Sequence, residues 1–347
     1  MMESGKNEIM KILCNWDIEP VSFKKAEIGD SNCWIVQAKD GKYVLKSKTH
    51  FHNEAKPQIE DVSELDFERK YLQFLKDNGF PFELPIPIKA KNGSYFLEIG
   101  RGFYWLYRYI EGVIKERFNG EEIGKVARMM AQYHSIVEDS DMENDAQPEE
   151  AFAAEYLANR LEELQNVSKT GKRLPGEDRL FLKEAPFFIK ALNALKTTTQ
   201  AGMERFPLHR DIKPAHIIWN GDSISGVIDF DDVLVFRDAV IKDIAHMLKH
   251  TFRKQNNGLI DIPLTKCFME EYVKERPLTR LELDMLPDSL VQACIGSFAS
   301  LHFKLLMKRA GETDRKARNA TLRKLVMVAN AAKFAYDNRA RIAKEIS

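Results

Sequence analysis

The stretch "LHRDIKPAHIIWNGDSISGVIDFDD", residues 208–232, decides the fold. Residues 217–219 are strand formers, "NGD" is a tight-turn signal and "ISGVI" returns the chain, so the stretch predicts a β-hairpin. Asp211 precedes the first strand and Asp229 ends the second, which should bring both carboxylates to the same end of the hairpin. Such carboxylates can form an acid–base pair for glycoside hydrolysis, bind a hard cation or accept backbone hydrogen bonds.

The composition sets the class of protein around this stretch. The chain has 347 residues, 44% apolar and 30% charged, which is enough for one large or two moderate hydrophobic cores. Lys plus Arg equals Asp plus Glu at 52 each, so no net charge favours nucleic acid or an anionic membrane.

The four cysteines lack CxxC spacing, the N-terminus has no signal-peptide pattern, and no segment approaches the roughly 20 apolar residues of a membrane helix. These features predict a soluble, cytoplasmic protein.

The pattern of apolar residues predicts two lobes of different kinds. Before residue 111, strand-like runs at 21–48 and around "SYFLEI" and "FYWLYRYIEG" flank a helical period at 63–79. After it, helical periods dominate at 121–138, 149–166, 177–198, 238–250, 263–276 and most of 279–346. We therefore predict an α+β fold with a small antiparallel-sheet lobe at 1–110 and a mostly helical lobe at 111–347.

Charge is unevenly spread within the second lobe. Residues 136–165 hold ten acidic and one basic residue, whereas 296–347 hold twelve basic and four acidic residues. Solvated helix faces or a surface for a substrate or partner both account for this pattern.

The motif at 209–229 distinguishes between the uses of its two aspartates. "HRD" at 209–211, a polar residue at 216, a hairpin and then "DF" at 229–230 resemble the catalytic loop and metal-binding aspartate of kinases. The chain is similar to the aminoglycoside phosphotransferase and choline kinase-like family, which shares a bilobal fold with protein kinases; bacterial spore-coat kinase-like proteins are one branch. The resemblance implies ATP and Mg²⁺ as cofactors, Asp211 as the base that accepts the acceptor's hydroxyl proton, and Asp229 as a magnesium ligand.

The same resemblance assigns the phosphate-binding residues of the small lobe. In "EIGDSNCWIV", Gly29 permits close backbone approach, and Ser31 and Asn32 offer donors to phosphate oxygens. Lys46 directly ends the apolar run "YVL" and is preferred as the lysine against the α and β phosphates. Lys48, two residues along the same strand face, is its competitor.

The remaining small-lobe positions concern a glutamate and the hinge strand. Glu68 is the preferred partner of Lys46, with Glu64 one turn earlier as the alternative and a surface glutamate as the structural reading. Tyr107 and Tyr109 lie where the hinge strand would meet adenine, although strand packing explains aromatic residues there equally well.

Two residues of the large lobe, His209 and Asp243, are expected to support the site. Asp243 matches a helix-borne acceptor for the catalytic loop's backbone or for His209. His134, near the end of the first large-lobe helix, is expected to be a structural histidine.

His216 is the clearest departure from the family, which usually has asparagine there. Asparagine offers a hard oxygen to Mg²⁺, whereas imidazole suits softer metals such as zinc or manganese. Three outcomes are open: an active kinase that relies on Asp229 for metal, an active kinase with another metal preference, or a degenerate fold that binds without transferring.

Other features weigh against alternative readings. Lys213 matches a protein kinase lysine, but the eight residues between Asp229 and Asp238 leave no room for a peptide-docking segment. Asp231 and Asp232 stand where the family has a glycine after "DF". They could join the metal site or attract a cationic substrate, and solvated loop acids are the preferred interpretation.

Two histidine pairs, 50 with 52 and 246 with 250, lack an obvious third metal ligand at motif spacing. We therefore predict a monomeric or homodimeric kinase for a small hydroxylated acceptor such as a sugar, amino alcohol, homoserine-like metabolite or aminoglycoside. A binding or spore-coat-like structural protein on the same fold is the alternative.

Overall fold

The computed structural model describes residues 2–26, 32–49, 62–100, 102–142, 149–197, 201–234, 237–255, 259–309 and 315–346. The chain divides into two compact units. The first contains Met1–Val113 and Ile218–Leu234, and the second contains Ile114–Ile217 and Val235–Ser347. The sequence suggested a single boundary near residue 110; the structure adds that the hairpin after residue 217 groups with the N-terminal part.

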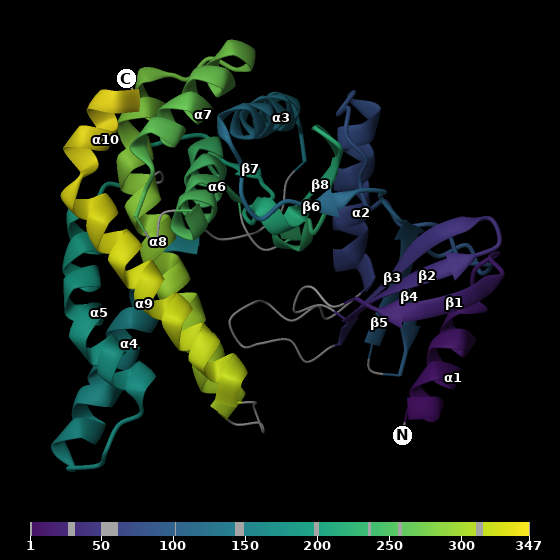
Figure 1. Ribbon diagram of the computed structural model, residues 1–347, viewed down its shortest axis with the longest axis horizontal. Coiled ribbons are helices and arrows are strands. Elements are labelled where there is room, and N and C mark those ends of the chain that lie inside the picture. The colour runs from purple at the N-terminus through teal and green to yellow at the C-terminus, as the bar shows by residue number, and fades with distance from the viewer. Residues whose placement is uncertain are drawn as a thin grey trace. The chain divides into compact units, whose positions relative to one another are not determined.

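An antiparallel sheet forms the centre of the first unit (Figure 1). Its strands, in the order β1-β2-β3-β5-β4, are β1 (Pro20–Lys25), β2 (Asn32–Ala38), β3 (Gly41–Thr49), β5 (Gly102–Arg108) and β4 (Leu97–Ile99). The predicted turn at 39–42 joins β2 to β3, where Gly41 has a φ of 152° that a side chain would strain.

The two faces of this sheet bury different helices, because neighbouring residues of a strand point to opposite sides. Tyr43 and Leu45 of β3 join a core cluster with Ile12 and Leu13 of α1 (Met2–Leu13). Val44 packs against the cluster that contains the α2 (Val62–Asp77) residue Leu65, together with Phe96, Phe103, Trp105 and Tyr107. The α2 helix confirms the predicted period at 63–79, whereas the sequence analysis did not identify α1.

A hairpin completes the first unit. The strands β8 (Ile217–Asn220) and β9 (Ser223–Val227) pair as predicted and form a small sheet with β6 (Val113–Ile114), and the short helix η2 (Asp231–Leu234) follows. Gly112, at a φ of 145°, lies so close to this hairpin that a Cβ atom would stand 2.4 Å from the backbone oxygen of Trp219. The close approach explains why glycine ends the "YRYIEG" run.

The second unit is built from helices, as the sequence predicted. They are α3 (Gly120–Glu138), α4 (Glu149–Lys169), α5 (Gly176–Ala194), α6 (Val240–Gln255), α7 (Ile262–Glu275), α8 (Arg280–Arg309), α9 (Arg315–Asp337) and α10 (Arg339–Ile346), with η1 (Pro214–His216), β7 (Phe206–Pro207) and β10 (Arg237–Asp238) between them. Local chemistry fixes their ends: the Asn119 side chain accepts from the Glu122 N–H, and the Glu122 carboxylate accepts from the Asn119 N–H, which is a capping box.

Helices α6 and α8 lie at the centre of this unit. In Figure 1, α8 and α9 run side by side, and α6 packs against α8. Residues 241–249 of α6 are buried all round, although they include charged side chains. A helix buried on every side normally carries apolar residues. The buried charged groups of α6 therefore indicate a functional role for this helix.

Helix α8 corrects one expectation from the sequence. Residues Arg280–Leu306 are long and apolar enough to cross a membrane by length and mean hydropathy, although we expected no such segment. Of its most apolar window, 61% is buried inside the protein, as in the core helix of a folded unit. Its apolar character is therefore explained by packing against α6 and α9.

Candidate active site

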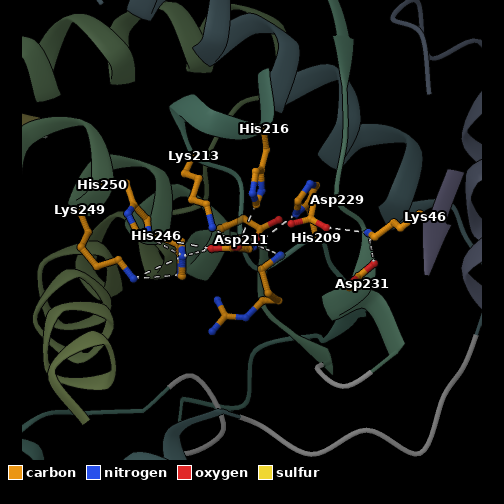
Figure 2. Close-up of polar contacts among 12 residues, drawn as sticks. Lys46, His209, Asp211, Lys213, His216, Asp229, Asp231, His246, Lys249 and His250 are labelled. Carbon is orange, nitrogen blue, oxygen red and sulfur yellow. Dashed lines mark hydrogen bonds and ion pairs between the residues drawn. The ribbon is translucent and has the colours of Figure 1, made fainter. Parts of the chain in front are cut away.

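In the first unit, the ammonium group of Lys46 lies between two carboxylates (Figure 2). Lys46 Nζ donates to Asp229 Oδ1 at 2.8 Å and to Asp231 Oδ1 at 2.7 Å. Lys48 Nζ lies 2.9 Å from the second oxygen of Asp231. Burial opposes the charge on Lys46, but the two aspartates raise its pKa well above the ordinary value. The lysine is therefore a fixed positive charge at physiological pH.

The pairing of strands β3 and β5 determines the position of Lys46. Lys46 of β3 lies opposite Trp105 of β5, and its ammonium lies 5.6 Å from the centre of the Trp105 ring. Lys48, two residues on, shares that face and lies 5.9 Å from the same ring. Both lysines thus lie on the sheet face that packs against α2, where their ammonium groups lie over the Trp105 ring.

Glu68 of α2 is buried near this cluster but is not among the ion-pair partners of Lys46 in the part of the chain that the structure describes. Its Oε2 atom has no hydrogen-bond partner among the described residues. Burial, followed by repulsion from Asp231, raises the pKa of Glu68 to about 7. Among the described residues, the ion-pair partners of Lys46 are Asp229 and Asp231, and the charge of Glu68 also raises the pKa of Lys46. The role of Glu68 as the residue that orients Lys46 stays a prediction.

Asp231 corrects a second expectation. We expected a solvated loop acid, but its side chain is only 17% exposed and contacts both lysines. Burial raises its pKa less than Lys46 and Lys48 lower it, so the net pKa is well below the ordinary value. The position of Asp231 at the start of η2 brings it into the cluster.

Two residues of the motif adopt left-handed backbone conformations that side chains rarely take. Asp229 has a φ of 69° and Arg210 a φ of 57°. Such conformations cost about 1–3 kcal/mol each and occur where surrounding contacts enforce them, often at functional sites. For Arg210, the enforcing contacts include its N–H, which donates to Asp243 Oδ1 at 2.8 Å, and its guanidinium, which lies 3.8 Å from Asp238.

In the second unit, Asp211 is surrounded by cationic or basic groups (Figure 2). Lys213 Nζ donates to its Oδ2, His246 Nε2 lies 3.1 Å from its Oδ1, and His216 Nδ1 lies 3.7 Å from Oδ2. Burial opposes ionisation, but the His246 contact and the charges of His216 and Lys213 hold the pKa of Asp211 well below its ordinary value. Asp211 is thus an ionised hydrogen-bond acceptor, and its side chain is 24% exposed.

Buried polar residues hold the loop that carries Asp211. His209 N–H donates to the Tyr133 hydroxyl at 2.9 Å, next to the Arg210 contact with Asp243. Asp243 therefore makes the backbone contact suggested by its place on α6. His134 is fully buried, with Nδ1 2.7 Å from the Tyr272 hydroxyl and Nε2 3.5 Å from Asp243. These contacts fit the structural role expected for His134.

The structure describes only some of the other predicted nucleotide-binding residues. Gly29 and Ser31 lie outside the described residues, and for Asn32 only the backbone in β2 is described. Tyr107 is buried in the core next to α2. The Tyr109 N–H donates to the Lys42 carbonyl at 3.0 Å, which engages one backbone donor expected to meet adenine.

His216 belongs to the second unit with Asp211. Its ring is 7% exposed and stacks near the ring of His209, with ring centres 5.9 Å apart. Its role as a metal ligand stays a prediction.

Sequence reasoning missed the functional potential of His246 and His250. Both lie on α6, one turn apart, and Asp211 lies within 4.0 Å of each through its Oδ1 atom. The spacing of the two histidines was visible in the sequence, but their approach to a loop 35 residues away was not.

Comparison with known proteins places this arrangement in a family. The family model described as "Phosphotransferase enzyme family" matches residues 23–262, more than half of the chain. A homoserine kinase of Pseudomonas aeruginosa is 22% identical over 234 residues, which cover 67% of this chain and 68% of that protein.

Solved structures agree in fold. A microcompartment-associated aminopropanol kinase has a TM-score of 0.66 at 12% identity, covering 98% of this chain and 99% of that one. The choline kinase LicA from Streptococcus pneumoniae has a TM-score of 0.56 at 14% identity, covering 94% and 98%. The predicted α+β kinase-like fold is thus confirmed, and the chain belongs to the phosphotransferase enzyme family.

Proposed function

We propose that this protein transfers the γ-phosphoryl group of ATP to the hydroxyl of a small metabolite that carries a carboxylate, with a homoserine-like compound as the first candidate. The observation that carries the proposal is an ionised Asp211 held among cationic groups in the second unit. Family membership supports the phosphotransfer, and the residue roles and the acceptor class are our inference.

Asp211 orients the acceptor hydroxyl and receives its proton. A carboxylate with a depressed pKa is a weak base, so early removal of the hydroxyl proton is not its contribution. The transition state of phosphoryl transfer is loose, and alignment of the attacking oxygen matters more than early proton transfer. A firmly held, ionised acceptor, contacted at Oδ2 by Lys213 and at Oδ1 by His246, suits this task.

The Lys46 cluster supplies the nucleotide side of the chemistry. We assign Lys46 to the α and β phosphates, because a buried ammonium on a rigid strand is a preorganised anion partner. Asp229 fits a magnesium ligand: it offers hard carboxylate oxygens and its side chain is 32% exposed. Magnesium bound there would neutralise charge on the phosphate oxygens. The imidazole of His216 is a poorer ligand for that ion, which favours the outcome in which Asp229 alone carries it.

The charges around Asp211 favour an anionic group on the acceptor. Lys213 contacts Asp211 directly, and Lys249 places its ammonium 3.2 Å from His246, which contacts Asp211 in turn. A field of this sign attracts a carboxylate and repels a polycation such as an aminoglycoside. Relatives that are homoserine kinases support the same choice, since homoserine carries both a primary hydroxyl and a carboxylate.

The test uses a matched pair of acceptors. L-Homoserine and 3-aminopropanol share the hydroxyl, the chain and the amine, and differ in the carboxylate. We expect acceptor-dependent ADP production with L-homoserine at a kcat/KM at least about tenfold above that with 3-aminopropanol, as one ion pair provides. In Lys249→Gln the ratio should shrink, because one positive charge is lost.

Two results would overturn different parts of the proposed function. Equal use of both acceptors would remove the carboxylate from the proposal and leave the kinase. Nucleotide binding without ADP production from any sugar, amino alcohol, hydroxy amino acid or aminoglycoside would favour the alternative, a binding or structural protein on a kinase fold.

A further inference from the structure

Three metal-ligating side chains converge in the second unit, outside the groups assigned to nucleotide binding. His246 and His250 lie one turn apart on α6, and Asp211 comes from the loop before η1 (Figure 2). Their nearest atoms are 3.0 Å apart between the two Nε2 atoms, 3.1 Å between His246 Nε2 and Asp211 Oδ1, and 4.0 Å between His250 Nε2 and Asp211 Oδ1.

Hydrogen bonding alone serves this cluster poorly. His246 Nε2 is within hydrogen-bond distance of both Asp211 Oδ1 and His250 Nε2. A proton on that nitrogen makes its best bond by pointing straight at one partner, which weakens the contact with the other. A cation between the three atoms attracts a lone pair from each of them.

We propose that Asp211, His246 and His250 form a binding site for a zinc-like divalent cation. Separations of about 3–4 Å between ligand atoms suit an ion bound at about 2.0–2.2 Å by two imidazoles and one carboxylate. Two histidines four residues apart on a helix face are a common zinc-binding pair. This donor set favours Zn²⁺ over Mg²⁺, which prefers oxygen ligands.

Metal binding here withdraws Asp211 from the acceptor. The same Oδ1 atom that would bind the ion is one of the two carboxylate oxygens available to a hydroxyl. The site is therefore inhibitory: a zinc-loaded protein holds nucleotide but cannot align the acceptor.

Lys249 opposes the ion and provides a sharp variant. It is 3% exposed, and its ammonium lies 3.2 Å from His246 Nδ1. The ammonium also lies 3.4 Å from His246 Nε2, the atom that must give its lone pair to the metal, and competes for that lone pair as a hydrogen-bond donor. The ammonium also repels the cation, so Lys249→Met should strengthen metal binding.

The direct test is titration of the full chain with Zn²⁺ by calorimetry, without nucleotide or Mg²⁺, together with Co²⁺ binding followed by visible absorption. We expect one equivalent of metal and a Co²⁺ spectrum of a low-coordinate site with nitrogen ligands. His250→Gln should weaken binding more than about tenfold because one of three ligands is lost. Lys249→Met should tighten it by a similar factor.

Lys274→Met, which removes a positive charge from an exposed position on α7, is the matched control for Lys249→Met. Its metal affinity should equal that of the wild type. Absence of stoichiometric Zn²⁺ binding in both the wild type and Lys249→Met would overturn the proposal, as would an affinity unchanged by His250→Gln. His250 is partly exposed, so this variant tests the site even if His246→Gln fails to fold.

The outcome is separable from the proposed function. Zinc binding is measured without catalysis, so the titration tests the zinc site even if no acceptor is phosphorylated. If the kinase is active and zinc binds with the expected dependence on His250 but does not inhibit, the inhibitory role is wrong and the site remains.

Discussion

Replacing Glu68 with glutamine should change how stability depends on pH. The unfolded carboxyl has its ordinary pKa of 4.5, and the folded one has a pKa of about 7, chiefly through burial. Between these values the folded state binds more protons than the unfolded state, so the free energy of unfolding falls as pH rises from about 4.5 to about 7. Above that window both states are ionised and the full penalty is present.

The size of the effect follows from the same two values. At about 1.4 kcal/mol per pKa unit, the interval from 4.5 to about 7 sets an upper bound of about 3.5 kcal/mol. Relaxation of Lys46 and Lys48 towards an ionised Glu68 reduces this, and we expect about 1–3 kcal/mol. The quantity to compare is how the difference in free energy of unfolding between variant and wild type changes with pH. Any constant contribution of the new amide group to that difference then cancels.

The assay is urea unfolding of the wild type and Glu68→Gln at several pH values from about 5 to 8. The variant should gain stability relative to the wild type as pH rises, and the gain should level off above about 7. Asp66→Asn, on the same helix, is the control: its partner Arg69 lowers the pKa of Asp66, so no relative change is expected above about pH 5. A constant difference between wild type and Glu68→Gln across the range would refute the reasoning.

Three further substitutions test other parts of the account. Gly112→Ala should destabilise the protein by about 2–4 kcal/mol, because the new Cβ would lie 2.4 Å from a backbone oxygen at a strained φ, whereas Gly93→Ala, with open space, should cost about 1 kcal/mol in denaturant unfolding. Asp243→Ala, which removes the acceptor, should cost about 1–3 kcal/mol and speed amide hydrogen exchange at Arg210, and unchanged exchange there would contradict its role as loop support. Lys46→Met should weaken ATP binding at least about tenfold by calorimetry, as loss of a buried phosphate partner requires; unaltered affinity would move the phosphate contact to another lysine.

Sequence periodicity predicted the large elements because apolar residues recur at helical or strand spacing along them. The helices of the second unit fall within a few residues of the predicted spans, and the hairpin at 217–227 follows its turn signal. The exception was α1, although Ile9, Ile12, Leu13 and Trp16 have helical spacing and join one core cluster. A short helix with few other apolar residues gave a signal too weak to separate from a polar terminus.

Side-chain partners were harder to predict, because they depend on contacts between distant segments. Glu68 is on the expected helix, but the arrival of Asp231 from a segment more than 160 residues later decided which acids pair with Lys46. The pair His246 and His250 was recognised on one helix face, and its third ligand, Asp211, came from a separate loop. Local sequence patterns predict the secondary-structure elements and which face of each is buried. Which charged side chains form pairs can be known only from the folded structure.

The kcat of Asp211→Asn with ATP and the preferred acceptor is the most direct test of the role of Asp211 in phosphoryl transfer. Asparagine keeps the shape but has no negative charge to hold the attacking hydroxyl or to receive its proton, so kcat should fall roughly 10²- to 10⁴-fold. The dissociation constant for the nucleotide, measured by calorimetry on the same variant, should stay within about threefold of the wild type, because the Lys46 cluster is unchanged. A variant that keeps wild-type kcat would contradict the assignment of Asp211 as the residue that aligns and deprotonates the acceptor.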